Sequence, residues 1–323
     1  MSVTEPRVTV LMSVYNDQGY LSEAIESILN QTYRDFEFLI IDDGSSEPIE
    51  PRLRAYGDNR IVSVRHPNMG LTRSLNRGLE LAKGRYIARM DADDVSLPDR
   101  LATQVQVLDA RPEVDMVGTF FDVVDHDNQL LERKELIIDP VYRLWRLQFH
   151  NNYGHGTMLL RRQSIIAAGM YDETLSYAQD YDLWCRVSTA CNTAIVPAVL
   201  YRYRMVKSSD QASVRNYDAQ LATAVAISDR NLSACNPALG PQGCIEVRAL
   251  YWKFPLPAVT RVGLKALPAT LEGFCRRFAI VEGERERLRE HVLNDALQEV
   301  AQTLSLREEA AEIESLLRKE FGS

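Results

Sequence analysis

Residues 68–101 read NMGLTRSLNRGLELAKGRYIARMDADDVSLPDRL and hold the patterns that decide the fold. Apolar residues recur at helical spacing over positions 71–82, and Gly84 follows, a residue favoured just past a helix end. Residues 85–90 predict a strand, and the acidic run DADD at 91–94 comes directly after it. A second helical pattern begins just beyond these acids. This succession predicts an α/β fold with an acidic loop at the end of a strand.

The same alternation of strand and helix patterns occurs upstream. Residues 8–14 are a compact apolar run rich in β-branched side chains, as expected of a strand buried on both faces, and residues 36–41 predict a second buried strand. Between them, residues 20–29 place apolar side chains on one helical face. Further along the chain, residues 61–65 predict a short strand. We therefore predict a mostly parallel, Rossmann-like sheet flanked by helices.

The remainder of the chain divides into a mixed part and a helical part. Residues 114–124 and 131–138 predict a pair of strands around a polar turn, and beyond residue 213 the pattern is helical to the end. We predict a nucleotide-binding and catalytic domain over 1–212 and a helical region over 213–323. Between these parts the sequence predicts short strands at 157–160 and 199–204 and helices at 162–168 and 178–188.

Composition excludes several functional classes. The formal net charge of −8 argues against a nucleic-acid partner that needs a broad basic face. The five cysteines show no metal-like spacing and indicate reduced thiols, as in a cytoplasmic protein. No apolar run is long enough to span a bilayer, and the N-terminus lacks the features of a signal peptide. We expect a cytoplasmic protein that at most contacts a membrane surface.

Asp91 and Asp93 emerge where a buried strand ends. Two carboxylates one residue apart can hold a hard divalent cation, with diphosphate oxygens completing its coordination. Such a cation would offset charge on a departing diphosphate. An isolated pair of this kind, an Asp-x-Asp (DxD) motif, also fits a turn that caps the next helix. The surrounding sequence therefore decides between a metal site and a turn.

Two other strands end in polar residues. Asp42 and Asp43 end one neighbouring strand, and Ser13 and Tyr15 lie at the end of the first. Ligand sites in parallel sheets gather outside the carboxyl ends of the strands, so we expect these side chains to share one crevice with the DxD acids. The carboxylates could hold a base or ribose there, and Tyr15 could stack on it.

With these motifs the chain resembles the family 2 glycosyltransferases, inverting enzymes of the GT-A fold. The resemblance runs from about Val8 to Arg204 and leaves the last third of the chain uncovered. Its motifs are VTVLMSVYN at 8–16, QTYRDFEFLIIDDGSS at 31–46, the stretch at 68–101, HGTMLLRR at 155–162 and QDYDLWCRV at 179–187.

The resemblance implies a nucleotide-sugar donor, most often a uridine one, and Mn²⁺ or Mg²⁺ as cofactor. Asp91 would contact the ribose and the metal, and Asp93 would contact the metal and the diphosphate. Ala92 lies between them in the binding loop. The nucleoside side would comprise Ser13, Tyr15 and Asp43, with Asp42 close by and Arg73 near the base or phosphates.

Asp180 matches the family's general base, which takes the acceptor hydroxyl's proton during in-line attack. Without the other motifs, Asp180 would be an ordinary first-turn helix acid. His155 occupies a position where the family commonly has His near the acceptor. The acceptor would be a saccharide or a lipid-linked saccharide.

The chain departs from the family pattern in two places. Gln179 precedes Asp180 where the family usually has Glu, so a negative neighbour is lost and acceptor contacts at Gln179 can differ. After the last strand the family often has Arg, one residue, then His, but here Val206 replaces the His. Arg204 or Lys207 could supply positive charge to the diphosphate instead.

Two alternative functions remain open from the sequence. A sugar nucleotidyltransferase generally needs a Gly-rich, cationic loop after the first strand, and the loop at 16–19 has one glycine and no cation. A non-catalytic nucleotide-sugar binder is supported only by the Gln179 and Val206 departures. The leading interpretation is an inverting hexosyl- or N-acetylhexosaminyltransferase in surface-polysaccharide or glycoconjugate assembly.

Residues 247–278 interleave basic and apolar side chains. This composition suits peripheral docking on the anionic inner face of the cell membrane. Pro255, Pro257 and Pro268 interrupt any long amphipathic helix, which favours instead a helical cap on the catalytic domain.

Overall fold

The computed structural model describes most of the chain, and the text below concerns these residues alone. Val206, Lys207 and the predicted domain boundary at residue 213 lie outside them, as do Pro255 and Pro257. The described ranges are 5–190, 192–205, 216–252, 260–302 and 310–321.

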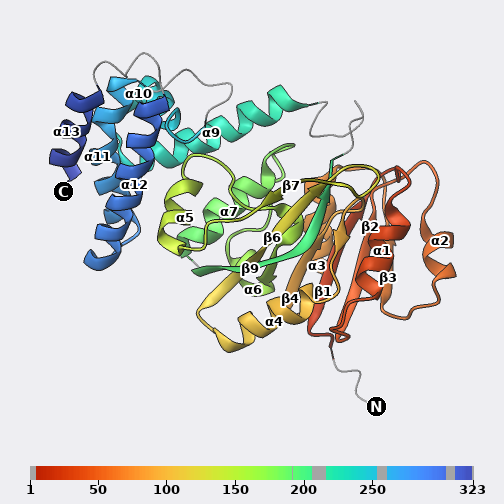
Figure 1. The fold of residues 1–323 in the computed structure, drawn as a ribbon. Helices are drawn as coiled ribbons and strands as arrows, with labels where there is room; N and C mark the ends of the chain where they lie inside the picture. The colour runs from red at the N-terminus through yellow and green to blue at the C-terminus, as the bar shows by residue number, and fades with distance from the viewer. Residues whose placement is uncertain (1–4, 191, 206–215, 253–259, 303–309, 322–323) are drawn as a thin grey trace. The chain divides into compact units, whose positions relative to one another are not determined.

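The first strands form the predicted parallel sheet (Figure 1). Strands β1 (Val8–Val14), β2 (Phe36–Asp42), β3 (Ile61–Arg65) and β4 (Tyr86–Met90) lie in the order β3-β2-β1-β4, and all these neighbours pair in parallel. Strands β1 and β2 are almost entirely buried, as their mainly apolar sequences predict. The carboxyl ends of β1, β2 and β4 therefore meet at one edge of the sheet.

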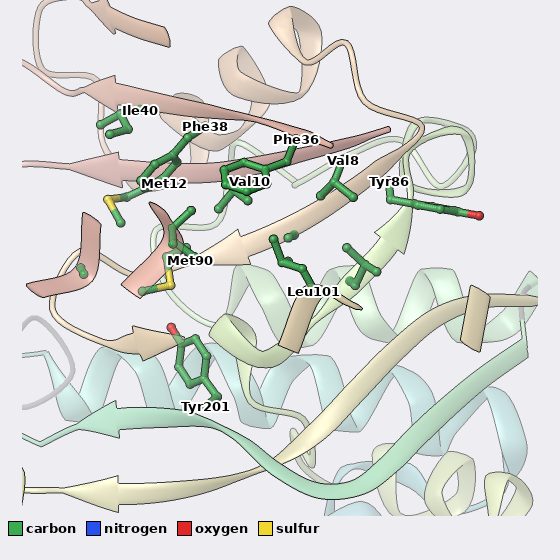
Figure 2. Close-up of a cluster of buried hydrophobic side chains, with 14 of the residues drawn as sticks. Val8, Val10, Met12, Phe36, Phe38, Ile40, Tyr86, Met90, Leu101 and Tyr201 are labelled. Atoms are coloured by element: carbon green, nitrogen blue, oxygen red, sulfur yellow. The ribbon is translucent and has the colours of Figure 1, made fainter. Parts of the chain in front are cut away.

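Helices cover both faces of this sheet. Val8, Val10 and Met12 alternate along β1 into one core cluster, shown in Figure 2. Leu11 points the other way, where a Cβ added to Gly78 would clash with the Leu11 side chain. The core cluster takes its helical residues from α1 (Leu21–Leu29), α2 (Glu50–Ala55) and α4 (Arg100–Ala110). Gly78 belongs instead to α3 (Leu71–Leu81).

Beyond β4 the sheet is mixed. Strand β8 (Leu159–Arg161) pairs antiparallel with β4, and β6 (Val114–Val124) pairs antiparallel with β8 and β7 (Leu130–Lys134) but parallel with β9 (Asn192–Arg204). Strand β5 (Val95–Ser96) follows the acidic loop and pairs with the end of β9. The loop after β4 is thus held next to β9.

Short helices complete the first unit, which comprises Met1–Ile138 and Tyr153–Gln220. The HGT segment forms the 3₁₀ turn η1, which leads into β8. The first turn of α7 carries Asp180, in agreement with the helix predicted at 178–188. The bounds of these helices are α2 (Glu50–Ala55), η1 (His155–Thr157), α6 (Arg162–Ala167) and α7 (Gln179–Ala190).

The second unit comprises Asp139–Asn152 and Leu221–Ser323 and is helical, as predicted for the C-terminal region. The sequence did not predict α5, whose Trp145 is fully buried and donates a hydrogen bond to Tyr251 Oη at 3.0 Å. The helices are α5 (Pro140–Leu147), α9 (Tyr217–Cys235, which crosses the boundary), α10 (Gly240–Arg248), α11 (Arg261–Arg277), α12 (Glu282–Gln302) and α13 (Ala310–Phe321).

Helix α11 corrects one expectation about the basic stretch. The helix continues through Pro268 instead of ending there. Leu264, Leu271 and Phe274 are buried in the core of the second unit, and this packing compensates for the backbone hydrogen bond that proline cannot donate. These apolar residues serve the helical core. Of the described helices, none is long and apolar enough to cross a membrane.

Candidate active site

One cavity of about 480 Å³ brings together the predicted catalytic and metal-binding residues. Asp91 and Asp93 reach it from the loop after β4, and Asp180 from the first turn of α7. His155 and Gln179, the predicted acceptor-side residues, line it as well. The loop after β4 and the first turn of α7 line the same cavity, which brings together residues almost 90 positions apart in the sequence.

The two DxD carboxylates differ in their electrostatic surroundings. Asp91 Oδ1 lies 2.5 Å from Nη2 of Arg89, a guanidinium whose side chain is only 2% exposed. Among the residues that the structure describes, no Lys or Arg forms an ion pair of this kind with Asp93. Burial, followed by the charge of Asp91, raises the pKa of the Asp93 carboxyl to about 6. The pair therefore carries negative charge that a bound cation would compensate. Among the described residues, no group of three or more Asp, Glu, His or Cys could hold a metal ion.

A buried network anchors this acidic loop. Asp94 is 1% exposed and accepts hydrogen bonds from Tyr201 Oη and from the backbone N–H of Arg204, both at 2.8 Å. Burial, followed by the charges of Asp93 and Asp91, raises the pKa of Asp94 well above its usual range. The sequence analysis did not identify Asp94 or Tyr201 as site residues. The sequence signal for Asp94 was its place as the third acid of the run DADD at 91–94, and such a run fits a helix cap equally well.

Arg204 has a different environment from the one predicted. Its side chain is 1% exposed, and Nε donates to the backbone carbonyl of Asp93 at 2.8 Å. The five N–H groups of a guanidinium all find acceptors here, so none points toward a bound diphosphate. The geometry thus favours a positioning role over the diphosphate contact expected from the sequence. The other acceptors are the carbonyls of Asp125 and His126, Glu23 Oε2 and Asn128 Oδ1.

We expect Arg204→Met to lower the free energy of unfolding by about 3 kcal/mol, because it removes a buried guanidinium and leaves several carbonyls without their hydrogen-bond donor. Urea denaturation of the purified variant measures this change. Arg202→Met, on the same strand but partly exposed, is the matched control. A change at Arg204 no larger than about 0.5 kcal/mol, the usual effect of a surface substitution, would contradict the anchoring role.

The predicted nucleoside residues lie beside the cavity and do not line it. Asp43 is 2% exposed, and its carboxylate accepts hydrogen bonds from the backbone N–H groups of Met69 at 2.8 Å and Gly70 at 3.0 Å. Asp42 is equally buried and accepts from Ser45 N–H at 2.9 Å. Both carboxylates therefore hold loops in place at the ends of the strands.

Other groups near these loops remain accessible. Tyr15 is 56% exposed where β1 ends, and Ser13 is partly buried beside it. Arg73 is exposed and forms an ion pair with Glu173 at 3.5 Å. A pocket of about 440 Å³, lined by Arg65, His66 and neighbouring loop residues, opens on the same side.

Aromatic side chains surround His155, the residue predicted to lie near the acceptor. His155 Nε2 lies 2.8 Å from Tyr171 Oη, and the His155 ring packs edge-on against Trp184 at 5.9 Å. Burial, followed by the charge of Arg89, lowers the pKa of His155 well below its usual range, so the imidazole is neutral. Gln179 is 7% exposed at the start of α7, next to Asp180.

Sequence comparison places this site in a known family. The family model described as "Glycosyl transferase family 2" matches residues 9–169. The O-antigen biosynthesis glycosyltransferase WbnJ of Escherichia coli is 32% identical over 217 residues, which cover 65% of this chain and 84% of WbnJ. The chain belongs to glycosyl transferase family 2.

Solved structures with the same fold include S. aureus TarS and an archaeal mannosyltransferase. The crystal structure of S. aureus TarS 1-349 in complex with UDP-GlcNAc aligns with a TM-score of 0.60 at 15% identity and covers 97% of this chain and 92% of that one. The mannosyltransferase PcManGT from Pyrobaculum calidifontis, in complex with GDP-Man and Mn²⁺, aligns with a TM-score of 0.53 at 17% identity over 98% and 86% of the two chains. The family 2 domain thus has the GT-A fold that the sequence predicted.

Proposed function

We propose that this family 2 protein is an inverting glycosyltransferase that moves a sugar from a nucleoside-diphosphate sugar onto an acceptor hydroxyl. The observation that carries this proposal is the single cavity lined by Asp91, Asp93 and Asp180. One part of it can hold a diphosphate through a cation, and another presents a carboxylate to a hydroxyl. The similarity to an O-antigen enzyme supports a role in surface-polysaccharide assembly.

The chemistry of the DxD pair fits a divalent metal. Asp91 and Asp93 supply only oxygen ligands, which suit Mn²⁺ or Mg²⁺. The pKa of Asp93 is raised first by burial and then by the charge of Asp91, and a bound cation would offset both effects. A bound metal would offset the charge that develops on the departing diphosphate. The Arg89 guanidinium would keep the Asp91 carboxylate in place.

We propose that the nucleoside lies over the ends of β1 and β2. The exposed ring of Tyr15 offers a stacking face, and Ser13 a hydroxyl. Asp42 and Asp43 would act mainly by fixing the loops, while Arg73 could exchange Glu173 for a phosphate or base oxygen. A uridine donor is the proposal that the family resemblance supports.

Asp180 is the proposed general base. Its partly exposed carboxylate would accept the proton of the acceptor hydroxyl as that oxygen bonds to the anomeric carbon. The anomeric carbon–oxygen bond breaks at the same time, and its electron pair leaves with the diphosphate. Attack opposite the leaving group inverts the anomeric configuration.

A donor screen tests the proposed function. We expect the wild-type protein with Mn²⁺ to release a nucleoside diphosphate from at least one common nucleotide sugar, faster when glycoside acceptors are present. Coupled nucleotide detection measures the release, and EDTA should abolish it. A protein that binds nucleotide sugars but releases no nucleoside diphosphate would be a binder and not a transferase.

A further inference from the structure

Helix α3 carries two polar residues on its buried face. Thr72 and Asn76 lie four positions apart, so their side chains are neighbours on the same side of the helix. The two residues are only 6% and 5% exposed. Buried polar groups cost free energy unless they form hydrogen bonds, so the partners of these side chains indicate what this face of the helix does.

Both side chains bond to the backbone of the segment 171–175. Asn76 Nδ2 donates to the carbonyl of Tyr171 at 2.9 Å, and Asn76 Oδ1 accepts from the N–H of Tyr171 at 3.0 Å. The Thr72 hydroxyl donates to the carbonyl of Leu175 at 2.9 Å. Helix α3 therefore holds this segment at its first and at its last residue.

The backbone on either side of the segment adopts an unfavourable conformation. Met170 and Ala178 have φ angles of 57° and 50°, in the left-handed region that residues with a Cβ rarely adopt. Residues 172–174, which lie between them, are exposed and bury little apolar surface. A strained backbone of this kind persists only where surrounding contacts determine it. The hydrogen bonds from α3 are such contacts.

The segment leads directly into the cavity. The next five residues, 176–180, all line it, and the last of them is Asp180 in the first turn of α7. At the start of the segment, Tyr171 Oη lies 2.8 Å from Nε2 of His155, which lines the cavity as well. A displacement of the segment would therefore move cavity residues at both of its ends.

The other end of α3 belongs to the donor side. The helix begins after Gly70, whose backbone N–H donates to the Asp43 carboxylate at 3.0 Å, where β2 ends. The proposed nucleoside site lies over the same strand end. One helix thus connects the proposed donor site with the segment that precedes the proposed base.

We infer that Thr72 and Asn76 are positioning residues that set the place of Asp180 relative to the bound donor. Neither residue lines the cavity, so their effect passes through the backbone of the segment 171–175. In-line attack needs aligned reacting atoms about 3–3.5 Å apart and a base within hydrogen-bond reach of the hydroxyl. This inference rests on the proposed function and adds two residues to its machinery.

Asn76→Ala removes both hydrogen bonds to Tyr171. We expect kcat for transfer to fall at least about tenfold, because a misplacement of about 1 Å can cost a hundredfold. The Kd of the donor with Mn²⁺, measured by calorimetry, should stay unchanged. Transfer is measured with the nucleotide sugar and the octyl glycoside that the wild type uses fastest. Arg77→Gln, on the exposed face of the same helix, is the control and should change neither quantity.

A double-mutant cycle separates positioning from a general loss of structure. If Asn76 acts through Asp180, adding Asn76→Ala to Asp180→Asn should lower the residual kcat by less than about twofold, because the base that it positions is already gone. A smaller folded fraction or a disturbed donor site would lower kcat by the same factor in both backgrounds. Equal factors would overturn the inference.

Thr72 offers a gentler pair of variants that should fold. Thr72→Val replaces the hydroxyl by a methyl group, whereas Thr72→Ser keeps the hydroxyl that bonds to Leu175. We expect kcat to fall at least about threefold in Thr72→Val, through loss of one buried hydrogen bond, and to stay near the wild-type value in Thr72→Ser. A normal kcat in Thr72→Val, or an equal loss in both variants, would contradict the positioning role.

Failure of the proposed function gives a distinct result. In that case the wild type itself releases no nucleoside diphosphate, and the inference falls with the proposed function. Transfer by the wild type together with a normal kcat in Asn76→Ala would overturn the inference alone.

Discussion

Replacing Asp180 by Asn should lower kcat for transfer by about a thousandfold and leave donor binding unchanged. General-base catalysis typically contributes about 10²–10⁴-fold, and an amide cannot accept the hydroxyl proton. The side chain keeps its size at the first turn of α7, so the cavity should keep its shape. Steady-state kinetics measures the first effect, and calorimetric titration with the donor and Mn²⁺ measures the second.

Asp218→Asn is the matched control for Asp180→Asn. Asp218 is also a first-turn acid, at the start of α9, but it is exposed and does not line the cavity. If Asp180 only interacted with the helix dipole, both variants would lose a similar, small amount of stability and keep their activity. Near-normal transfer by Asp180→Asn would show that the proposed base is wrong.

Replacing Asp93 by Asn should have opposite effects on binding and on stability. Donor affinity in Mn²⁺ should fall at least about a hundredfold, because one of two charged metal ligands is lost. The metal-free protein should become more stable at pH 8, since burial and Asp91 disfavour the ionised form of Asp93. Because the pKa is raised from 3.8 to about 6, this cost is absent at pH values well below 3.8, grows as pH rises between these two values and stays constant above about 6.

Calorimetric titration and thermal unfolding with and without Mn²⁺ check both effects. Glu47→Gln removes one charge from an exposed position and should change neither quantity. Unchanged metal-dependent binding in Asp93→Asn would exclude this carboxylate as a ligand. A lower melting temperature in the metal-free variant would instead indicate a structural role.

The fold was predictable wherever local pattern and burial agree. The runs in β1 and β2 are mainly apolar and were predicted to within one residue. Strand β9 begins at Asn192, seven residues before the predicted start, although Pro197 interrupts its pattern. Its pairing with β6 shifts register beside this proline, passing from Val196 to Val199, and such an irregularity accommodates a residue that cannot donate a hydrogen bond.

Helix α5 was not predicted because its burial depends on distant residues. It is eight residues long, too short to give a firm helical period, and its Trp145 packs against Tyr251, 106 positions later. The pairing between Arg204 and Glu23 spans 181 positions and was invisible for the same reason. The sequence therefore offered Arg204, beside Lys207, as a possible diphosphate contact, whereas in the folded chain its guanidinium bonds to the backbone carbonyl of Asp93 in the acidic loop.

The candidate site was predicted in two ways. Asp91 and Asp93 followed from the rule that sites gather where parallel strands end, and they do line the cavity. Asp180 came from the family resemblance alone, since a first-turn acid has no local signature of catalysis. The strand-end rule also suggested direct ligand contacts for Asp42 and Asp43, whose carboxylates accept hydrogen bonds from neighbouring loops.

A crystal structure of the Asp180→Asn variant with Mn²⁺ and a donor that the wild type hydrolyses tests the central claim most directly. We expect the metal to contact Asp93 and the diphosphate, and the transferred sugar to lie in the cavity with its anomeric carbon facing residue 180. A diphosphate bound elsewhere, such as the basic pocket lined by Lys83, Arg85 and Arg162, would contradict the proposed site.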